Sequence, residues 1–358
     1  MIERRIKALR RELKKKRINC LVITKPANVT YVTGFLGGDS WAVVTSRSAY
    51  VVTDTRYTEQ AQGQCPHCRI IERAGPMEKA VTKLIERLKS VHTVALEKTT
   101  SIADFEALRK NIKTRIKPAA DIIETLRRCK DSSEIRAIPA AASIAEKALR
   151  RTLKQVKAGI SENELAGLLD FEIRRLGATH SFDTIVAFGP NASRPHHQPS
   201  ARKLKKKDTI LVDFGAKYKG YCCDITRCFV VGRSTALYKR VFAAVEDAQA
   251  AAIRVIKPGV EITRVDAAAR EVIKERGLPV YGHGTGHGLG LEIHELPFLK
   301  TESKGKLQTG DVVTIEPGIY MPGKLGVRIE DDVLVTETGC RILTRRCPHE
   351  SLLSAWQS

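Results

Sequence analysis

The sequence lacks any long uncharged hydrophobic run. No apolar stretch approaches the ~20 residues that a helix needs to cross a bilayer. The opening segment MIERRIKALRRELKKKR is basic and contains no apolar core of the kind found in secretory signals. We therefore expect no membrane span and predict a cytoplasmic location.

The cysteines show no spacing of a disulfide framework. They number nine, which is odd, and they are scattered along the chain, so no disulfide is predicted and a reducing compartment is favoured. Cys65 and Cys68 have the spacing of half a zinc site. A structural zinc site needs four ligands and no second Cys or His pair lies near them, so we interpret this segment as a surface loop.

Acidic residues are few relative to basic ones, and the net charge is +21. Residues 1–130 hold 27 Lys and Arg against 13 Asp and Glu. Such a charge can attract nucleic acid or acidic peptides. However, Ile2, Ile6, Leu9 and Leu13 recur at helical spacing, which places the basic residues between them on the solvated side of one helix. We favour a solvated basic face, and nucleic acid is not an expected partner.

At 358 residues the chain is long enough for two domains, each with its own core. From residue 20 to about 117, short apolar runs such as CLVIT and YVVTD alternate with helical patterns, which is typical of an α/β domain. The basic segment LRRCKD then marks a change of pattern. We place the boundary between 1–123 and 124–358.

The second part contains an internal duplication. VKAGISENELAGLLDFEIRRLG, ending at Gly177, aligns with IKPGVEITRVDAAAREVIKERG, ending at Gly277. Each segment is read as a helix, capped by Ser161 in the first copy and by Thr263 in the second, and closed by glycine. Two similar halves with a site between them are predicted.

Two matched hairpins place four acids in strand-like runs. Asp213 and Asp224 flank the turn KYKG, and Glu316 and Glu330 flank Met-Pro-Gly-Lys-Leu-Gly. Strand interiors disfavour Asp, and an apolar core does not hold unpaired carboxylates. The four acids therefore need a positive partner, either a pair of divalent metal ions or, for acids at strand ends, Lys and Arg.

A glycine-rich run, YGHGTGHGLGLEIHE, contains three histidines, His283, His287 and His294. Imidazole is a good ligand for Mn, Co, Zn or Fe, and glycine lets the backbone approach a site closely. No Gly-Lys-Ser or Gly-Lys-Thr comes after it, which argues against a phosphate loop. His196 occupies a place in the first half near the one that His294 occupies in the second.

The motifs VDFG, CCDITR, HGTGHGLGLEIHE, TIEPGIY and VRIED, in this order, resemble the catalytic domain of the creatinase/prolidase/aminopeptidase P superfamily. Residues 1 to about 123, including NVTYVTGF, resemble the N-terminal domain of prolidases and aminopeptidases P. The resemblance implies an α+β fold. It has a pita-bread catalytic domain with a pseudo-twofold duplication, preceded by a smaller α/β creatinase-like domain.

The resemblance also implies the roles of individual residues. Two divalent ions, with manganese expected and Co, Zn or Fe as alternatives, are bound by Asp213, Asp224, His287, Glu316 and Glu330. Catalytic roles fall to His196, His283, His294 and Glu316, the last as proton acceptor and His294 as the group that stabilises the oxyanion. The substrate-binding site is lined by Phe182, Pro195 and Arg328.

The function implied is hydrolysis of the Xaa-Pro bond in short peptides, by a homodimer. Whether the chain is a dipeptidase or an aminopeptidase stays open, as does the native metal. One alternative is a methionine aminopeptidase, against which the extra N-terminal domain and the pair His283 and His287 argue. Another is a non-catalytic pita-bread protein that binds nucleic acid or basic-surface partners, which would have no reason to keep the ligand set.

Overall fold

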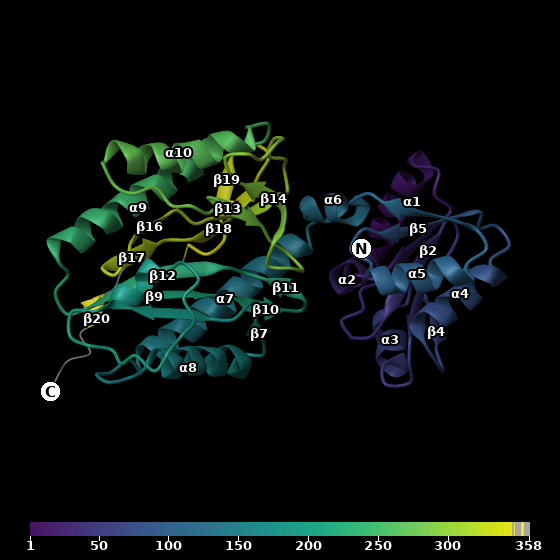
Figure 1. The fold of residues 1–358 in the computed structure, drawn as a ribbon, viewed down its shortest axis with the longest axis horizontal. Coiled ribbons are helices and arrows are strands. Elements are labelled where there is room, and N and C mark those ends of the chain that lie inside the picture. The colour runs from purple at the N-terminus through teal and green to yellow at the C-terminus, as the bar shows by residue number, and fades with distance from the viewer. Residues whose placement is uncertain (346, 348–351, 354–358) are drawn as a thin grey trace. The chain divides into compact units, whose positions relative to one another are not determined.

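The computed structural model describes residues 1–345, 347, 352 and 353 (Figure 1). The chain forms two compact units, Met1–Arg127 and Arg128–Ser358, and each is described by itself. No helix in the described residues is long and apolar enough to cross a membrane.

The N-terminal unit is built on one six-stranded sheet with the order β4-β3-β2-β1-β5-β6. The central β1 is buried along its whole length and pairs antiparallel with β2 and parallel with β5. A strand buried on both faces needs a continuous apolar run, which CLVI provides. The strands are β1 (Cys20–Ile23), β2 (Trp41–Thr45), β3 (Ala49–Thr53), β4 (Arg69–Glu72), β5 (Thr93–Glu97) and β6 (Arg115–Ala119).

Six helices accompany this sheet, and the alternation of strands and helices expected from the sequence is present. In the first helix Ile6, Leu9 and Leu13 are buried, as their spacing predicts, and most of the basic residues between them are exposed or half-buried. The helices are α1 (Ile2–Lys15), α2 (Pro26–Thr33), α3 (Thr58–Gln64), α4 (Met77–Arg87), α5 (Ile102–Asn111) and α6 (Ile122–Arg128).

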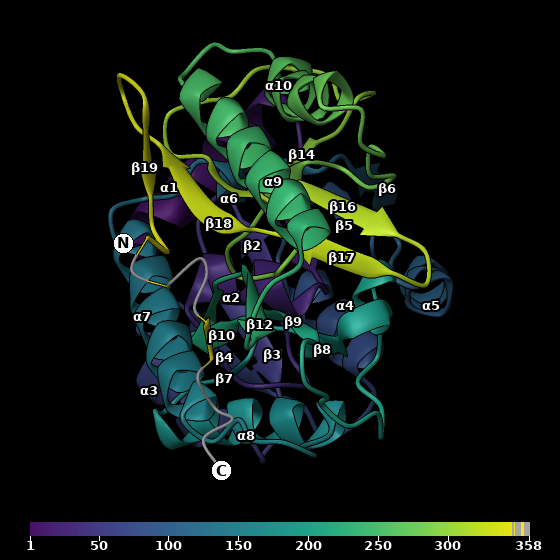
Figure 2. The ribbon, with the colours of Figure 1, turned by 90° about the vertical axis from the view of Figure 1, so that its left-hand side faces the viewer.

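The C-terminal unit shows the duplication in its helices. The long α7 (Glu134–Leu153) precedes α8 (Glu162–Arg175), and the long α9 (Ala236–Val255) precedes α10 (Ile262–Glu275). The bounds of α8 and α10 differ by 100 residues at both ends. Figures 1 and 2 show the strands of this unit between the α7 and α8 pair and the α9 and α10 pair.

The expected helix caps hold in one half only. Ser161 caps α8 in a capping box with Glu164, as predicted. The expected Thr263 cap is wrong, because α10 begins one residue after Glu261, which has no side-chain cap bond, and Thr263 already lies inside the helix. Thr263 falls where Asn163 stands in the first half, so its hydroxyl is two residues past the N-cap position.

Among the described residues of this unit, the strands form four sheets, in the orders β20-β12-β9-β8, β14-β13-β15-β18-β19, β11-β10-β7 and β16-β17. The first and third contain β7 (Thr179–His180), β8 (Ile185–Phe188), β9 (Thr209–Phe214), β10 (Ala216–Tyr218), β11 (Tyr221–Cys222), β12 (Ile225–Val231) and β20 (Leu352–Leu353), with the short helix η1 (Gly189–Ser193) after β8. The others contain β13 (Gly286–Gly288), β14 (Glu295–Leu299), β15 (Val312–Ile315), β16 (Gly318–Met321), β17 (Leu325–Arg328), β18 (Asp331–Val335) and β19 (Cys340–Ile342).

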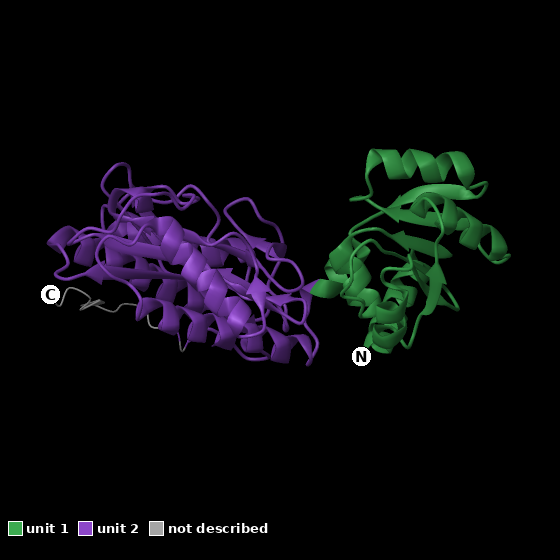
Figure 3. Ribbon diagram, turned by 90° about the horizontal axis from the view of Figure 1, so that it is seen from below, with its two compact units in different colours: residues 1–127 green, residues 128–358 purple. Residues whose placement is uncertain are grey.

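The division between the units is marked by colour in Figure 3. It lies after Arg127, within the last turn of α6, whereas the boundary expected from the sequence lies between residues 123 and 124. Each unit has a core of its own, with Val22, Val43 and Leu96 in the first and Val245, Val313 and Val333 in the second.

Candidate active site

Two antiparallel strand pairs bring the four predicted acids to one place. Asp213 lies in β9 opposite Thr226 of β12, and Asp224 directly precedes β12. The predicted turn between them closes β10 onto β11, and its residues Lys219 and Gly220 both have positive φ, as a type I′ hairpin requires. The predicted pairing of this hairpin is confirmed.

The second half repeats this arrangement. Glu316 directly follows β15, and Glu330 directly precedes β18, which pairs antiparallel with β15. The pair β16 and β17 forms the intervening hairpin, with Gly323 in its turn at a φ of 69°. The acids of both halves therefore sit at the ends of paired strands rather than in mid-sheet, except Asp213.

The histidine of the cluster comes from β13, between two glycines that have no room for a side chain. A Cβ on Gly286 would lie 1.9 Å from the Thr314 carbonyl oxygen, and one on Gly288 would lie 2.2 Å from the Leu296 carbonyl oxygen. The Nδ1–H of His287 donates to the Gly288 carbonyl at 3.1 Å. The other ring nitrogen, Nε2, is then unprotonated and carries the lone pair that a metal ligand needs.

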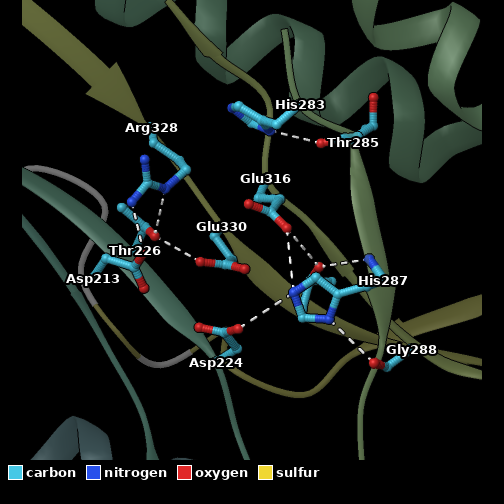
Figure 4. A network of polar contacts seen from close by, with 12 residues as sticks. Asp213, Asp224, Thr226, His283, Thr285, His287, Gly288, Glu316, Arg328 and Glu330 are labelled. Atoms are coloured by element: carbon cyan, nitrogen blue, oxygen red, sulfur yellow. Dashed lines mark hydrogen bonds and ion pairs between the residues drawn. The ribbon is translucent and has the colours of Figure 1, made fainter. Parts of the chain in front are cut away.

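Figure 4 shows how these side chains converge. One ligand atom from each of Asp224, His287 and Glu330 lies within 4.8 Å of the others. The Nε2 atom of His287 is 3.6 Å from Asp224 Oδ2 and 3.4 Å from Glu316 Oε1. All four of these side chains therefore share one small volume.

Arg328 holds the fifth predicted ligand, Asp213. Its Nη2 donates to Asp213 Oδ2 at 2.6 Å, and its Nε donates to Thr226 Oγ1 at 3.1 Å. Thr226 in turn donates to Glu330 Oε2 at 2.6 Å. Arg328 also donates to the Tyr320 hydroxyl at 2.8 Å and is only 3% exposed, so it connects the acids of the two halves.

The single positive charge of Arg328 does not balance the negative charge of the buried acids. Asp213 Oδ1 and Asp224 Oδ1 are buried and have no hydrogen-bond partner among the described residues. Burial, and then repulsion from Glu330 and Asp213, raises the pKa of Asp224 well above its usual range. Burial raises the pKa of Glu316 to about 7. The pKa of Glu330 is raised well above its usual range by burial and by repulsion from Glu316.

Such a set of groups fits divalent cations. Unpaired buried carboxylates are costly, and a cation among them favours their charged forms. Carboxylate oxygens with one imidazole nitrogen are the donors that Mn, Fe, Co or Zn accept. The residues present therefore fit a metal centre.

A cavity of about 500 Å³ opens beside the acids. Its lining includes every site residue predicted from the sequence, namely Phe182, Pro195, His196, Asp213, Asp224, His283, His287, His294, Glu316, Arg328 and Glu330. The structure thus brings all of them together, from both halves of the unit.

The remaining histidines line this cavity in different ways. His283 donates from Nδ1 to the Gly284 carbonyl at 2.7 Å, and its Nε2 lies 3.0 Å from the Tyr320 hydroxyl. Burial lowers the pKa of His283 to about 4, so its ring is neutral near pH 7. The ring of His294 lies 4.4 Å from that of His287, edge to face, and His294 and His196 are exposed to the cavity.

Sequence reasoning missed several residues of the site. Tyr320 links Arg328 to His283 through its hydroxyl, and Phe298 and Lys300 line the cavity from and just after β14. Tyr320 stands in the TIEPGIY motif, two residues after Gly318, which was a usable signal. Nothing in the segment around Lys300 marked it in advance.

Comparison with known proteins supports this description. Residues 136–337 match the model of metallopeptidase family M24, and residues 5–129 match the creatinase/prolidase N-terminal domain. The chain is 41% identical over 333 residues to the uncharacterized peptidase YqhT of Bacillus subtilis, covering 91% of this chain and 94% of that protein. It is 34% identical to the Xaa-Pro dipeptidase of Pyrococcus furiosus, covering 96% and 98%.

Solved structures agree. The Xaa-Pro dipeptidase of Bacillus anthracis superimposes with a TM-score of 0.93 at 36% identity, covering 98% of this chain and 99% of that one. The X-Pro aminopeptidase of Thermotoga maritima gives a TM-score of 0.87 at 36% identity, covering 92% and 97%. The expected two-domain fold, a creatinase-like domain before a pita-bread domain, is confirmed. The chain therefore belongs to metallopeptidase family M24 and is a peptide hydrolase of a divalent-metal-dependent class.

Proposed function

We propose that this protein hydrolyses the Xaa-Pro bond of short peptides with two divalent ions. The ions are bound by Asp213, Asp224, His287, Glu316 and Glu330, and manganese is the ion we favour over Co, Zn or Fe. The observation that carries the proposal is the buried group of four carboxylates and one imidazole beside a peptide-sized cavity, with two carboxylate oxygens lacking a partner among the described residues.

The chemistry divides between the ions and the chain. When bound, the ions would supply Lewis acidity toward the scissile carbonyl and would acidify a water molecule. Glu316 would accept the proton of that water, since its carboxylate lies beside the other proposed ligands, with Oε1 3.4 Å from His287 Nε2. His294, at the open side of the cluster, donates a hydrogen bond to the carbonyl oxygen as it gains negative charge.

The two other histidines act on the substrate rather than on the water. His283 acts as a neutral hydrogen-bonding group, because burial lowers its pKa to about 4 and Tyr320 is within 3.0 Å of its Nε2. His196 lines the cavity and is exposed to an incoming peptide. We assign it to substrate binding and proton exchange.

Selection of proline follows from the apolar part of the cavity. The bond before proline has no N–H, so its pocket needs no acceptor there and must instead fit a rigid ring. Phe182, Ile185 and Pro195 supply apolar lining, and Arg328 lies on the polar side. A shape preference of this kind is worth only ~1–3 kcal/mol, so slower cleavage of Xaa-Ala is expected.

Among Xaa-Pro substrates we favour dipeptides, because of Lys300. The cavity is lined by two Lys or Arg side chains, and Arg328 is already bonded to Asp213. Lys300 forms no ion pair with an acid among the described residues. It lies next to Gly284 in the cavity wall, since a Cβ added to Gly284 would be 3.4 Å from the Lys300 Cβ. A free cation at the rim suits the terminal carboxylate of a dipeptide, which a longer peptide lacks at that place.

The test is a comparison of substrates on dialysed protein, with and without added manganese. We expect metal-dependent cleavage of Xaa-Pro dipeptides, slower cleavage of Xaa-Pro-Yaa, and two ions per chain by elemental analysis. Much faster cleavage of Met-Ala peptides would favour the methionine aminopeptidase alternative. Full activity with only trace metal would overturn the metal mechanism.

Two further properties belong to the same proposal. We propose a homodimer, on family resemblance, and light scattering that finds only monomer at micromolar concentration would contradict it. We also propose a cytoplasmic location, which the nine free cysteine thiols suit.

A further inference from the structure

The loop that carries His196 has little regular structure of its own. After β8 and the short η1, residues 194–202 form neither helix nor extended strand before β9. Pro195 and His196 line the cavity from this loop. Their position therefore depends on whatever fixes the loop from outside.

Arg328 Nη2 donates to the Pro195 carbonyl at 3.4 Å, and one buried carboxylate accepts several further hydrogen bonds from the loop and the residues before it. Glu162, at the start of α8, is fully buried and accepts five hydrogen bonds from the loop and from the end of β8. The donors are Phe188 N at 2.8 Å, Asn191 Nδ2 at 2.8 Å, His197 Nε2 at 2.8 Å, Ser200 N at 3.1 Å and Ser200 Oγ at 2.5 Å. The donors span residues 188 to 200, so they surround His196 in the sequence.

This carboxylate is not needed to cap its helix. Ser161 already accepts from Glu164 N, and Glu164 bonds back to Ser161 N. Glu172, another buried acid of α8, is balanced by two arginines, Arg151 and Arg175. The partners of Glu162 are instead uncharged or histidine donors between Phe188 and Ser200. Burial alone would raise its pKa, but the hydrogen bonds from His197 and Ser200 lower it, which shows that they favour the charged form.

The contact with His197 transmits the constraint to the cavity. The His197 side chain is 5% exposed and points to Glu162, whereas its neighbour His196 is exposed and lines the cavity. His197 N also donates to the Arg194 carbonyl at 3.1 Å, which closes a turn with Pro195 and His196 at its centre. Anchoring His197 on Glu162 therefore fixes one end of the turn that carries His196.

We propose that Glu162 is a positioning residue of the active site, which holds His196 and Pro195 against the substrate through three hydrogen bonds from their loop and two from the residues just before it. The inference rests on the proposed function, since it assigns the residue a part in Xaa-Pro hydrolysis. Glu162 touches neither substrate nor metal, and it acts through the loop alone.

The test compares Glu162→Gln with Glu172→Gln, a matched control that is also buried on the same helix but bonds to arginines. The amide of Glu162→Gln keeps the shape but places an NH₂ group against N–H donors. We expect kcat/KM on an Xaa-Pro dipeptide to fall about 10- to 100-fold, because small misplacements of substrate-binding groups have effects of this size. Metal content should stay at the wild-type value, and Glu172→Gln should change only thermal stability.

A double-mutant cycle with His196→Ala identifies the route of the effect. If Glu162 acts through His196, then Glu162→Gln should lower kcat/KM by less than about 3-fold in the His196→Ala background, since effects of coupled residues do not add. Losses that multiply in the double variant would overturn the proposal, as would wild-type kcat/KM in folded Glu162→Gln. Should Glu162→Gln not fold, Ser200→Ala removes one donor, and unchanged kcat/KM there would count against the proposal.

A readout without turnover separates this inference from the proposed function. In ¹³C-labelled histidine spectra, the His196 resonance, assigned with His196→Ala, should shift or broaden in Glu162→Gln and stay in place in Glu172→Gln. If wild-type protein cleaves no Xaa-Pro peptide, the proposed function fails while this spectrum still tests the loop. An unmoved His196 resonance would overturn the positioning role whatever the substrate is.

Discussion

The two halves of the catalytic unit use the same device at different places on equivalent helices. In the first half Glu162 of α8 accepts from the loop that carries His196. In the second half Asp266 of α10 accepts from Thr285 N at 3.2 Å and Thr285 Oγ1 at 2.7 Å, in the loop that leads into His287. Because α8 and α10 are offset by 100 residues, Asp266 stands one helical turn beyond the counterpart of Glu162, on the same helix face.

The difference between the halves lies in the segment after the anchored loop. In the second half the loop continues into β13, between glycines that fix its backbone, and ends in a proposed metal ligand. In the first half it continues without a strand, and His196 faces the cavity. The two halves are thus alike in the strand pairs that carry their acids. They differ in the segments that carry His196 and His287, for which we propose different roles.

The largest expected effect should be the same in both halves, because each half supplies proposed metal ligands. Asp224→Ala in the first half and Glu330→Ala in the second should each lower kcat/KM about 1000-fold or more. Elemental analysis should find metal lost in both. Glu271→Ala, an exposed acid on α10, is the control and should behave as wild type. Activity retained in either ligand variant would contradict the ligand assignment.

The next effect separates the two anchoring carboxylates. Asp266→Asn should weaken metal binding about 10- to 100-fold, as loss of groups that orient a metal ligand does. Its loop holds His287, so calorimetric titration with Mn²⁺ should detect the change. Glu162→Gln should leave that affinity unchanged. Equal metal affinities for the two variants would show that the loops are not specialised.

A smaller effect concerns the cavity rim. Lys300→Gln should raise KM for an Xaa-Pro dipeptide about 5- to 10-fold, the scale of one charge-assisted hydrogen bond at an exposed site. Initial rates on the corresponding Xaa-Pro-amide, which has no carboxylate, should not change. Lys304→Gln, also exposed but outside the cavity lining, is the matched control. An equal rise of KM for the amide would rule out carboxylate recognition.

The smallest effect is a pH dependence of stability in the metal-free protein. The folded pKa of Glu316 is raised from 4.5 to about 7, so the stability it contributes is present below 4.5 and is lost as pH rises through 7. Asp224 and Glu330, also raised, add in the same direction. We expect the Tm difference between manganese-loaded and chelated protein to widen by roughly 5 °C from pH 5 to pH 8. A constant difference would argue that the acids are not the metal-linked groups.

Much of the site could be predicted because its groups violate the ordinary preferences of their elements. Asp213 within an apolar strand and His287 between glycines stand out from local sequence alone, and the 100-residue offset exposed the duplication. The fold itself was predicted by family resemblance, from motifs that occur in a fixed order along the chain.

The features that could not be predicted depend on contacts between distant segments. Glu162 reads as an ordinary acid in the first turn of a helix, and only the folded loop shows that five donors converge on it. The Thr263 cap was wrong because a hydroxyl residue was preferred to the aligned position: the counterpart of Ser161 is Glu261, and Thr263 lies inside the helix. Lys300 lies at the cavity only because β14 pairs with β13.

Reciprocal bonds across the two halves bear on the ancestry of the fold. Arg328 of the second half binds Asp213 of the first, and Thr226 of the first donates to Glu330 of the second. Either half alone would leave an acid of the cluster without its partner. The two halves of the catalytic unit therefore depend on each other, and a precursor equivalent to one half of this unit would have needed a second copy to make bonds of this kind.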